Sequence, residues 1–265
     1  MIQNINGVNV FVEDGAPTDE VNTVIETVNV DSAEPATETV TDDGDKKLVI
    51  DPKMYVYFDC EFTKLERDAQ LLSIGLCDAE GHSFYAEFTD YNMSEITDWV
   101  FANVLKKMVN PPTVLTGDHW TMRGTCKEIR QNLLIWLDAV HKHSNCGIQF
   151  VSDVCHYDMM LLVDLLWKNA RQMPEWIPPC CVDINMDLAN LARSYAEEKN
   201  ASISGPEYAF NPYYDAFNMD RDEYASHTKE VPQGMKHNSM YDAYVIRAIH
   251  QSIWSYNVDA TPLES

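Results

Sequence analysis

The chain has few basic residues, with 19 Lys and Arg against 42 Asp and Glu, so its formal charge over 265 residues is −23. Proteins bind nucleic-acid phosphates largely through Lys and Arg, and the shortage therefore argues against a sequence-specific DNA-binding module. It argues less against an enzyme in which bound metal ions supply the local positive charge. The composition thus excludes some classes of protein but not catalysis on an anionic substrate.

Paired cysteines and long apolar runs are also missing. The seven cysteines are scattered and form no Cys-x-x-Cys pair, which argues against a disulfide framework or a zinc ribbon. Free cysteines inside apolar runs behave as small hydrophobes, and a reducing cytoplasm is the expected compartment. The N-terminus lacks the basic and apolar segments of a signal peptide, and no apolar run is long enough to span a membrane. We expect a soluble, cytoplasmic protein that does not engage a membrane.

Residues 1–48 are an acidic extension with little to bury. Lys and Arg are absent before Lys46, and Phe11 is the only aromatic residue. Such a segment buries too little surface to offset chain entropy, so we expect it to be mobile or partly ordered. Residues 8–12 and 24–30 alternate in a way that fits a β-hairpin or an added edge strand. Two interpretations of the extension stay open, a tail for a basic protein partner and a solubilising appendage.

Residues 49–258 have the pattern of an α/β domain. Strands are expected at residues 54–60, 71–77, 82–88, 147–152 and 181–184. Helices are expected at residues 94–108, 125–140, 159–167, 186–198 and 240–256. The first three strands suit an antiparallel meander, and the later alternation of strand and helix favours a mixed sheet flanked by helices. An irregular insertion is expected at residues 200–236, and residues 259–265 form a tail.

Two local signals refine the helices. Thr125 and Glu128 have the spacing of a capping box, which predicts a helix start. The tryptophans on apolar helical stripes are expected in the core, and they are Trp99, Trp136 and Trp167. The spacing His141-x-His143-x-x-Cys146 resembles a metal site, but it falls at the end of a long helix, where cationic side chains favour the helix dipole. We interpret it as a helix terminus.

The stretch from Met54 to Glu61 organises the domain, because an apolar strand there ends with two acids, Asp59 and Glu61. Side chains two apart on a strand point to the same face, so both carboxylates would face one point. Two like charges at that distance raise a pKa unless a cation neutralises them, and Mg²⁺ prefers carboxylate oxygens. A lone Asp-x-Glu also fits a solvated strand end, and the metal interpretation needs further acids downstream.

Those acids are present. Asp158 begins a helix directly after a strand, a position where α/β proteins place functional groups, and its neighbour Asp153 competes with it as the third carboxylate. His237 and Asp242 form a His-x4-Asp unit that opens the last helix. Four carboxylates from three elements can hold two Mg²⁺ or Mn²⁺ ions about 3.5–4 Å apart, the arrangement for two-metal phosphodiester cleavage. An imidazole with an ordinary pKa of about 6.5 suits the proton acceptor.

In this order and on these elements, Asp59-x-Glu61, Asp158 and His237-x4-Asp242 resemble the DEDDh 3′–5′ exonucleases of the ribonuclease H-like superfold. The strands at 54–60 and 71–77 are similar to those of the small mycobacterial-type exoribonucleases. The segments around Asp158 and His237 are similar to those of the phage exodeoxyribonuclease A type. The resemblance covers about residues 54–250. It implies a ribonuclease H-like mixed sheet, an antiparallel meander plus parallel strands flanked by helices.

The resemblance also implies roles. Asp59 would bridge two divalent cations, Mg²⁺ or Mn²⁺. Glu61 and Asp242 would ligate the cation that activates water, Asp158 would hold the second, and His237 would be the general base. The substrate would be the 3′ end of single-stranded RNA or DNA, and a homodimer is compatible with the family. The tyrosine subtype of the family does not fit.

Residues after the acids would meet the substrate. Phe62 and Thr63 fall where relatives contact the terminal nucleotide, although a core position suits Phe62 equally well. Many relatives continue Asp-x-Glu with Thr-Thr-Gly, whereas this chain continues with Phe62-Thr63-Lys64, a departure that bears on sugar recognition. A rival interpretation is a catalytically vestigial acidic binding protein that occupies a basic surface of a partner. The full set of acids weighs against it, because a decoy needs no repelling carboxylates.

Overall fold

The computed structural model describes residues 2–5, 8–11, 52–190, 231–232 and 234–259. The chain divides into two compact units, Met1–Leu48 and Val49–Ser265. In the first unit, strands β1 (Ile2–Ile5) and β2 (Val8–Phe11) form an antiparallel pair. The alternation at residues 8–12 thus marks a strand, but its partner precedes it. Residues 24–30 and most of the insertion predicted at 200–236 lie outside the described residues.

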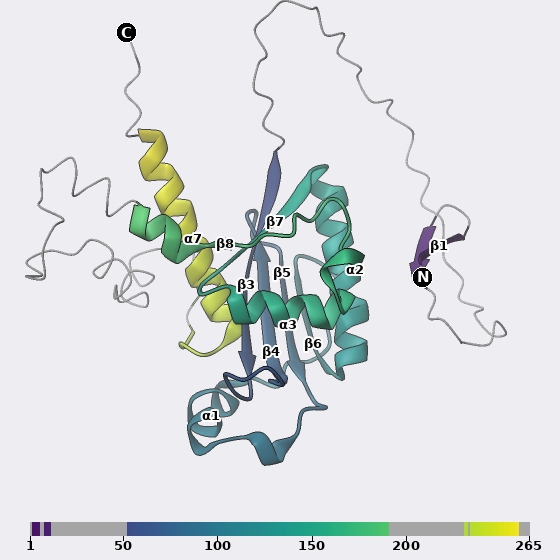
Figure 1. The fold of residues 1–265 in the computed structure, drawn as a ribbon, viewed down its shortest axis with the longest axis vertical. Helices are drawn as coiled ribbons and strands as arrows, with labels where there is room; N and C mark the ends of the chain where they lie inside the picture. Colours follow the sequence, from purple (N-terminus) through teal and green to yellow (C-terminus); the bar gives the residue numbers. More distant parts are fainter. Residues whose placement is uncertain (1, 6–7, 12–51, 191–230, 233, 260–265) are drawn as a thin grey trace, which may run out of the picture. The chain divides into compact units, whose positions relative to one another are not determined.

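The second unit is built on a six-stranded sheet (Figure 1). Its strands are β3 (Lys53–Phe62), β4 (Leu71–Asp78), β5 (Ser83–Phe88), β6 (His119–Gly124), β7 (Gly147–Ser152) and β8 (Val182–Asp183). They lie in the order β6-β5-β4-β3-β7-β8. Strand β4 is antiparallel to β3 and β5, whereas the other neighbours in the sheet are parallel. The predicted mixed sheet, an antiparallel meander plus parallel strands, is confirmed.

Helices cover both faces of this sheet. The α-helices with described bounds are α1 (Asp98–Asn103), α2 (Cys126–Ser144), α3 (His156–Trp167) and α7 (Ser239–Asp259). Residues 184–190, which directly follow β8, are also helical. The capping box predicted for α2 is present: the Thr125 side chain accepts from the Glu128 backbone N–H, and the Glu128 side chain accepts from that of Thr125.

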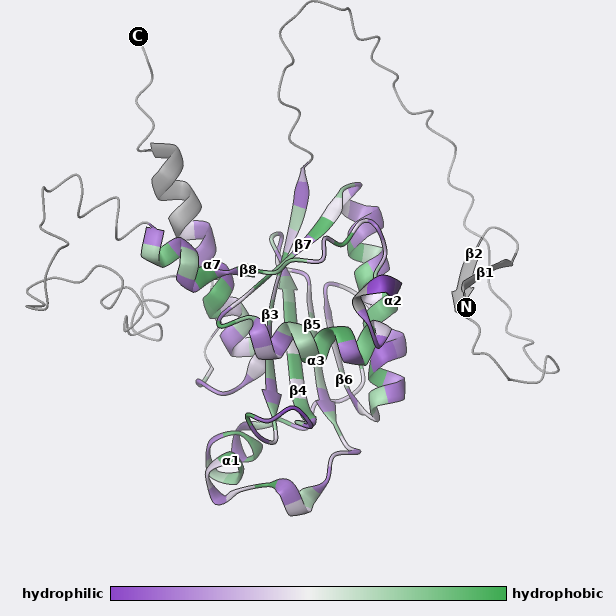
Figure 2. Ribbon diagram, viewed as in Figure 1, coloured by the Kyte–Doolittle hydropathy of each residue, from purple (hydrophilic) through white to green (hydrophobic). Residues whose placement is uncertain are grey.

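Alternation along β3 sends its side chains to two separate cores. Val56, Phe58 and Cys60 pack in a cluster with side chains of α2 and α3. Tyr57 packs in a second cluster with the apolar residues of α7. Figure 1 shows α3 crossing the sheet, and in Figure 2 the central strands are largely hydrophobic. Since side chains alternate, Asp59 continues the series that faces α7.

One predicted helix is wrong. Residues 94–108 form not a continuous helix but a 3₁₀ turn, the short helix α1 and a second 3₁₀ turn, Leu105–Lys107. The break occurs because the Thr97 side chain accepts a hydrogen bond from the Val100 backbone N–H and starts a new helix there. As a result Trp99, expected in the core, is 57% exposed. Trp136 and Trp167 are buried as predicted.

Strand β6 does not follow from the sequence pattern. It pairs in parallel with β5 and extends the sheet beyond the meander. None of the described helices has the length and apolar character needed to cross a membrane.

Candidate active site

Strand β4 contacts both the end of β3 and the start of α7, and it therefore brings these two segments together. In the β3–β4 pairing, Asp59 is opposite Gly75 and Glu61 is opposite Ser73. The hydroxyls of Ser73 and Ser239 are 2.9 Å apart and buried. A Cβ on Gly75 would lie 2.4 Å from the Ser239 carbonyl oxygen, so only glycine permits this approach. The first turn of α7 therefore rests directly on β4, beside the two acids.

Asn238 fixes the start of α7. Its side-chain oxygen accepts a hydrogen bond from the Tyr241 backbone N–H (3.2 Å), in the manner of an N-cap. Its amide nitrogen donates to the Tyr85 hydroxyl (3.3 Å) and to the Lys107 carbonyl (3.3 Å). The Tyr85 hydroxyl in turn donates to the buried carboxylate of Glu87 (2.8 Å). A chain of polar contacts thus connects the sheet to the helix that carries Asp242.

His237 and Asp242 lie together at this helix start. The His237 backbone N–H donates to Asp242 Oδ2 (2.8 Å), and His237 Nδ1 lies 3.9 Å from Glu61 Oε1. The backbone of His237 has φ 66°, a left-handed conformation that few residues other than glycine adopt. Carboxylate oxygens of Asp59, Glu61 and Asp242 lie within 4.8 Å of one another. Two distant segments therefore meet at one point.

Asp158 approaches from the other side of the sheet. It lies in the first turn of α3 and is 6% exposed. Its Oδ1 accepts a hydrogen bond from the Cys60 backbone N–H (3.1 Å), and its Oδ2 accepts one from Ser152 Oγ (3.5 Å). Because Cys60 lies between Asp59 and Glu61, this bond holds Asp158 beside both. It is a neighbour of the three-carboxylate group, not one of the three.

Burial and mutual repulsion raise the pKa values of these acids. The pKa of Asp59 is raised well above its usual value by burial and then by the charges of Asp158, Asp242 and Glu61. Burial, followed by the charges of Asp242 and Asp158, raises the pKa of Glu61 to about 8. Burial likewise raises the pKa of Asp158 to about 7, against its hydrogen bonds. The repulsion that the Asp-x-Glu spacing predicts is thus present.

The donor set suits a hard divalent cation. All the acids offer oxygen, the ligand that Mg²⁺ and Mn²⁺ prefer, and neutralisation by a cation would relieve the repulsion. The described basic side chain that lowers the pKa of Glu61 is Lys107, from the 3₁₀ turn after α1. Its ammonium donates to the Lys236 carbonyl (2.6 Å). Lys107 cannot be found by sequence pattern, because its place depends on the break at Thr97.

The residues predicted to meet substrate have different environments. The Phe62 ring stacks on the partly exposed Tyr157 ring, with centroids 6.0 Å apart, and also packs against the core. Thr63 is fully buried, and its hydroxyl accepts a hydrogen bond from the Gln70 backbone N–H (3.1 Å). A fully buried Thr63 is not open to a nucleotide, so we do not retain it as a substrate contact. Trp99, which the sequence placed in the core, instead lies edge-on to His237, with centroids 5.2 Å apart.

The other residues considered as metal ligands in the sequence lie outside the group of carboxylates. Asp153 accepts a hydrogen bond from the Asn185 side chain (2.7 Å). His141 Nδ1 is 2.8 Å from the Cys146 carbonyl oxygen, and its ring stacks on Trp176. His141 and Cys146 therefore do not form the metal site that their spacing resembles.

Two curated relatives match the chain in sequence. Both are 3′–5′ exoribonucleases of Mycobacterium tuberculosis, from strains H37Rv and CDC 1551. Each is 28% identical over 125 residues, which cover 47% of this chain and 68% of the relative. The resemblance to 3′–5′ exonucleases is confirmed.

Other comparisons add little to these relatives. No protein-family model matches the chain. Among solved structures, the catalytic unit of Neurospora crassa Pan2, with its protease and nuclease domains, overlaps at a TM-score of 0.36 and 11% identity. That overlap covers 82% of this chain but 29% of the other, too weak a likeness to bear on fold or function.

Proposed function

We propose that this protein is a metal-dependent 3′–5′ exonuclease that hydrolyses phosphodiester bonds at the 3′ end of single-stranded RNA or DNA. The observation that carries the proposal is the meeting of Asp59, Glu61 and Asp242 within 4.8 Å, with Asp158 bonded to the residue between the first two. Similarity to the two mycobacterial exoribonucleases supports the same activity. We assign it to residues 49–258.

The acids would hold two cations, Mg²⁺ or Mn²⁺. Asp59 would contribute to both, Glu61 and Asp242 to one, and Asp158 to the other. When bound, such ions activate water and stabilise the charge that develops on the phosphate. The carboxylates themselves contribute by being fixed: Asp158 is bonded to the β3 backbone, and Asp242 to the His237 N–H. Because their positions are set before substrate arrives, little reorganisation is needed.

His237 would be the general base. Its imidazole lies 3.9 Å from Glu61 and is 30% exposed, so it faces both the acids and the solvent from which water enters. The imidazole can accept a proton from water at a ring nitrogen and release it to solvent. The hydrogen bond from its own N–H to Asp242 keeps the ring at the edge of the acidic group.

Aromatic side chains beside the acids would bind the bases. Trp99 is exposed next to His237, and Phe62, which follows Glu61 on β3, stacks on Tyr157 of α3. Bases stack on such rings without regard to sequence, which suits an exonuclease that removes successive nucleotides. An acidic protein with few cations also depends more on stacking than on phosphate contacts.

The decisive experiment compares RNA and DNA oligonucleotides with a 5′ label in Mg²⁺ and in Mn²⁺. A 3′–5′ exonuclease shortens the labelled strand progressively, and a blocked 3′ terminus stops it. Asp158→Asn should lower kcat on the order of 10²-fold or more, since it removes a metal ligand. The matched control is Asp153→Asn, which changes a carboxylate from the same β7–α3 segment outside the group and should retain activity.

His237→Ala should also lose activity, with His119→Ala, an exposed histidine on β6, as its control. If wild type and all variants leave both oligonucleotides intact in either metal, the nuclease proposal fails and the acidic binding protein becomes the better interpretation. The homodimer, the cytoplasmic location and a basic partner for residues 1–48 stay predictions.

A further inference from the structure

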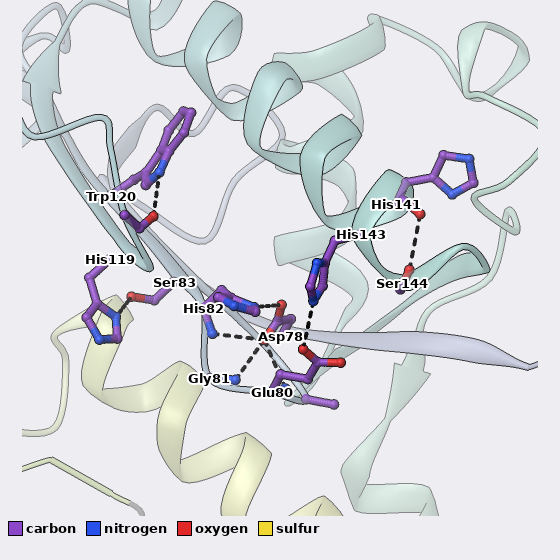
Figure 3. A network of polar contacts seen from close by, with 12 residues as sticks. Asp78, Glu80, Gly81, His82, Ser83, His119, Trp120, His141, His143 and Ser144 are labelled. Atoms are coloured by element: carbon purple, nitrogen blue, oxygen red, sulfur yellow. Dashed lines mark hydrogen bonds and ion pairs between the residues drawn. The ribbon is translucent and has the colours of Figure 1, made fainter. Parts of the chain in front are cut away.

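A second group of metal-ligating side chains lies at the turn between β4 and β5. Glu80 and His82 come from the turn, and His143 comes from the last turn of α2 (Figure 3). One ligand atom of each lies within 4.8 Å of the others. His143 Nε2 is 3.1 Å from Glu80 Oε2, and the two imidazole rings are 5.4 Å apart, edge to face. We call these three residues the turn cluster.

The turn cluster is separate from the candidate active site. In the β3–β4 pairing Asp78 is opposite Val56, whereas Ser73 is opposite Glu61. The two places are thus five strand residues apart, which corresponds to about 16 Å along the sheet. A metal at one place would not share ligands with the other.

Asp78 prepares His82 for a metal. Asp78 is buried, and its Oδ2 lies 2.6 Å from His82 Nδ1. Its Oδ1 accepts hydrogen bonds from the backbone N–H groups of Glu80 (2.9 Å), Gly81 (2.7 Å) and His82 (2.9 Å). A carboxylate on one ring nitrogen fixes the orientation and tautomer of a metal-binding histidine and leaves the other nitrogen to the ion. Here Nδ1 is engaged by Asp78, so Nε2 is the nitrogen that an ion would meet.

The turn itself is held in place. Gly81 has φ 105°, which a residue with a side chain rarely adopts and which allows the backbone to curl around Asp78. From the other side, Arg247 of α7 donates to the Ala79 carbonyl (2.9 Å). The backbone that carries Glu80 and His82 is therefore fixed before any ion arrives.

We propose that Glu80, His82 and His143 bind a transition-metal ion, with Zn²⁺ as the first candidate. Two imidazoles and one carboxylate are ligands that Zn²⁺ prefers, and three protein ligands leave a fourth position for water. Mg²⁺, by contrast, favours all-oxygen sites. The ion would tie the β4–β5 turn to the end of α2, and its role would be to stabilise that corner of the domain.

An ordinary surface ion pair does not account for the whole arrangement. Taken alone, the contact between Glu80 and His143 resembles such a surface ion pair, because the two side chains are 51% and 62% exposed. It gives no reason for His82 to lie at the same point with its Nδ1 already bonded to a buried carboxylate. The exposure of the other two ligands leaves a path for the ion from solvent.

The test uses the full chain, freed of metal by a chelator and then kept in excess Mg²⁺ so that the acidic site is filled. Co²⁺ serves as the probe, because a four- or five-coordinate site with imidazole ligands absorbs visible light far more strongly than octahedral oxygen sites do. We expect one equivalent of Co²⁺ to give this absorption, Zn²⁺ to displace it, and Zn²⁺ to raise Tm.

His143→Ala and Glu80→Gln change exposed side chains, so they should fold and keep their metal-free Tm. Each should weaken Zn²⁺ binding by at least the roughly 10- to 100-fold that loss of a supporting group costs. His119→Ala is the matched histidine control. Cys155→Ser is the second control, because Cys155, His156 and Asp183 are another group of metal-ligating side chains. Both controls should bind like wild type.

Three outcomes would overturn the proposal: no binding in excess Mg²⁺, equal binding by wild type and the His143 and Glu80 variants, or loss of binding only in Cys155→Ser. Activity on oligonucleotides in Mg²⁺ should not change in His143→Ala. Failure of this proposal is therefore distinguishable from failure of the nuclease proposal.

Discussion

At the scale of single residues, one face of β3 changes along the strand from apolar side chains to carboxylates. Tyr57 is buried in the cluster under α7, and two residues later on the same face Asp59 meets Asp158, Asp242 and Glu61. Burial and then the charges of neighbouring acids raise the pKa values of Asp59 and Glu61, so in the absence of metal the folded protein holds protons there that the unfolded chain releases. Protonation of this group and folding are therefore linked.

That linkage predicts how metal-free stability depends on pH. The pKa of Glu61 is about 8 in the folded protein, above its ordinary 4.5, so its stabilising contribution is present below about 4.5 and is lost as the pH rises through about 8. We expect the free energy of unfolding in chelator to fall on the order of 1–3 kcal/mol between about pH 5 and pH 8. Glu61→Gln should flatten this dependence, and Mg²⁺ should remove it.

Denaturant unfolding at a series of pH values measures the effect. Glu66→Gln, which changes an exposed carboxylate in the loop after β3, is the control and should follow wild type. Parallel curves for wild type and Glu61→Gln would contradict the assignment of raised pKa values to this group.

Trp99 supports a prediction about substrate binding. Trp99→Ala should raise KM for oligonucleotides about 5- to 150-fold, since stacking contributes about 1–3 kcal/mol per base, with a smaller effect on kcat. Trp99→Phe keeps a ring and should recover part of the loss. Steady-state kinetics on one oligonucleotide measure the change in KM. The control is Ile135→Ala on α2, which changes another exposed apolar residue. An unchanged KM in Trp99→Ala would remove this residue from the substrate path.

At the scale of elements, the site depends on how closely α7 approaches β4. Gly75→Ala would place a methyl group 2.4 Å from the Ser239 carbonyl and 2.5 Å from the Met240 backbone. Backbone cannot move aside as a side chain can, so the start of α7 must shift, at a cost of about 1–3 kcal/mol. We expect a lower Tm and a loss of activity larger than the loss of stability explains, because Asp242 and His237 move with the helix.

Thermal unfolding and Mg²⁺ affinity measured on the same preparation separate these effects. Gly117→Ala is the comparison: it has φ 74° but open space around it, so it costs backbone strain without moving an element. Should Gly75→Ala bind Mg²⁺ and cleave as wild type does, the close approach would not be what positions the acids.

Some features of these elements can be predicted from the sequence, whereas others cannot. The period of two along β3 and the helix starts close to Asp158 and Asp242 can be predicted from the sequence, because they follow from local geometry alone. The break at Thr97 cannot, since a continuous apolar stripe fits an unbroken helix equally well. Trp99 was therefore assigned to the core and is exposed.

Positions that matter only through contacts between distant segments cannot be predicted from the sequence, for a second reason. Gly75 is a glycine because of Ser239, and the two meet only in the folded chain. The proximity of Lys107 to Glu61 likewise depends on the turn that ends the α1 region. A local sequence pattern does not indicate which distant residues will be in contact. His143 shows the same limit, since its cluster partners Glu80 and His82 lie far away in the sequence.

At the scale of the whole molecule, a charge of −23 predicts an unusual salt response. Each phosphate contact on single-stranded nucleic acid contributes a slope of about −0.7 to a plot of log affinity against log salt. With Lys107 as the one phosphate contact from the described residues, we expect a slope of about −0.7 in fixed, saturating Mg²⁺. Measuring KM against KCl concentration tests this, and a slope steeper than about −3 would instead reveal an extended basic track.

The contact between Ser73 and Ser239 joins positions 166 residues apart, and it has a bearing on how the protein is made. At a ribosomal pace of about 5–20 residues per second, the first acids leave the exit tunnel roughly 10–30 seconds before the last helix. During that interval the growing polypeptide cannot assemble the complete acidic group. A nuclease built this way would stay inert beside its own messenger until the helix that carries Asp242 has been synthesised.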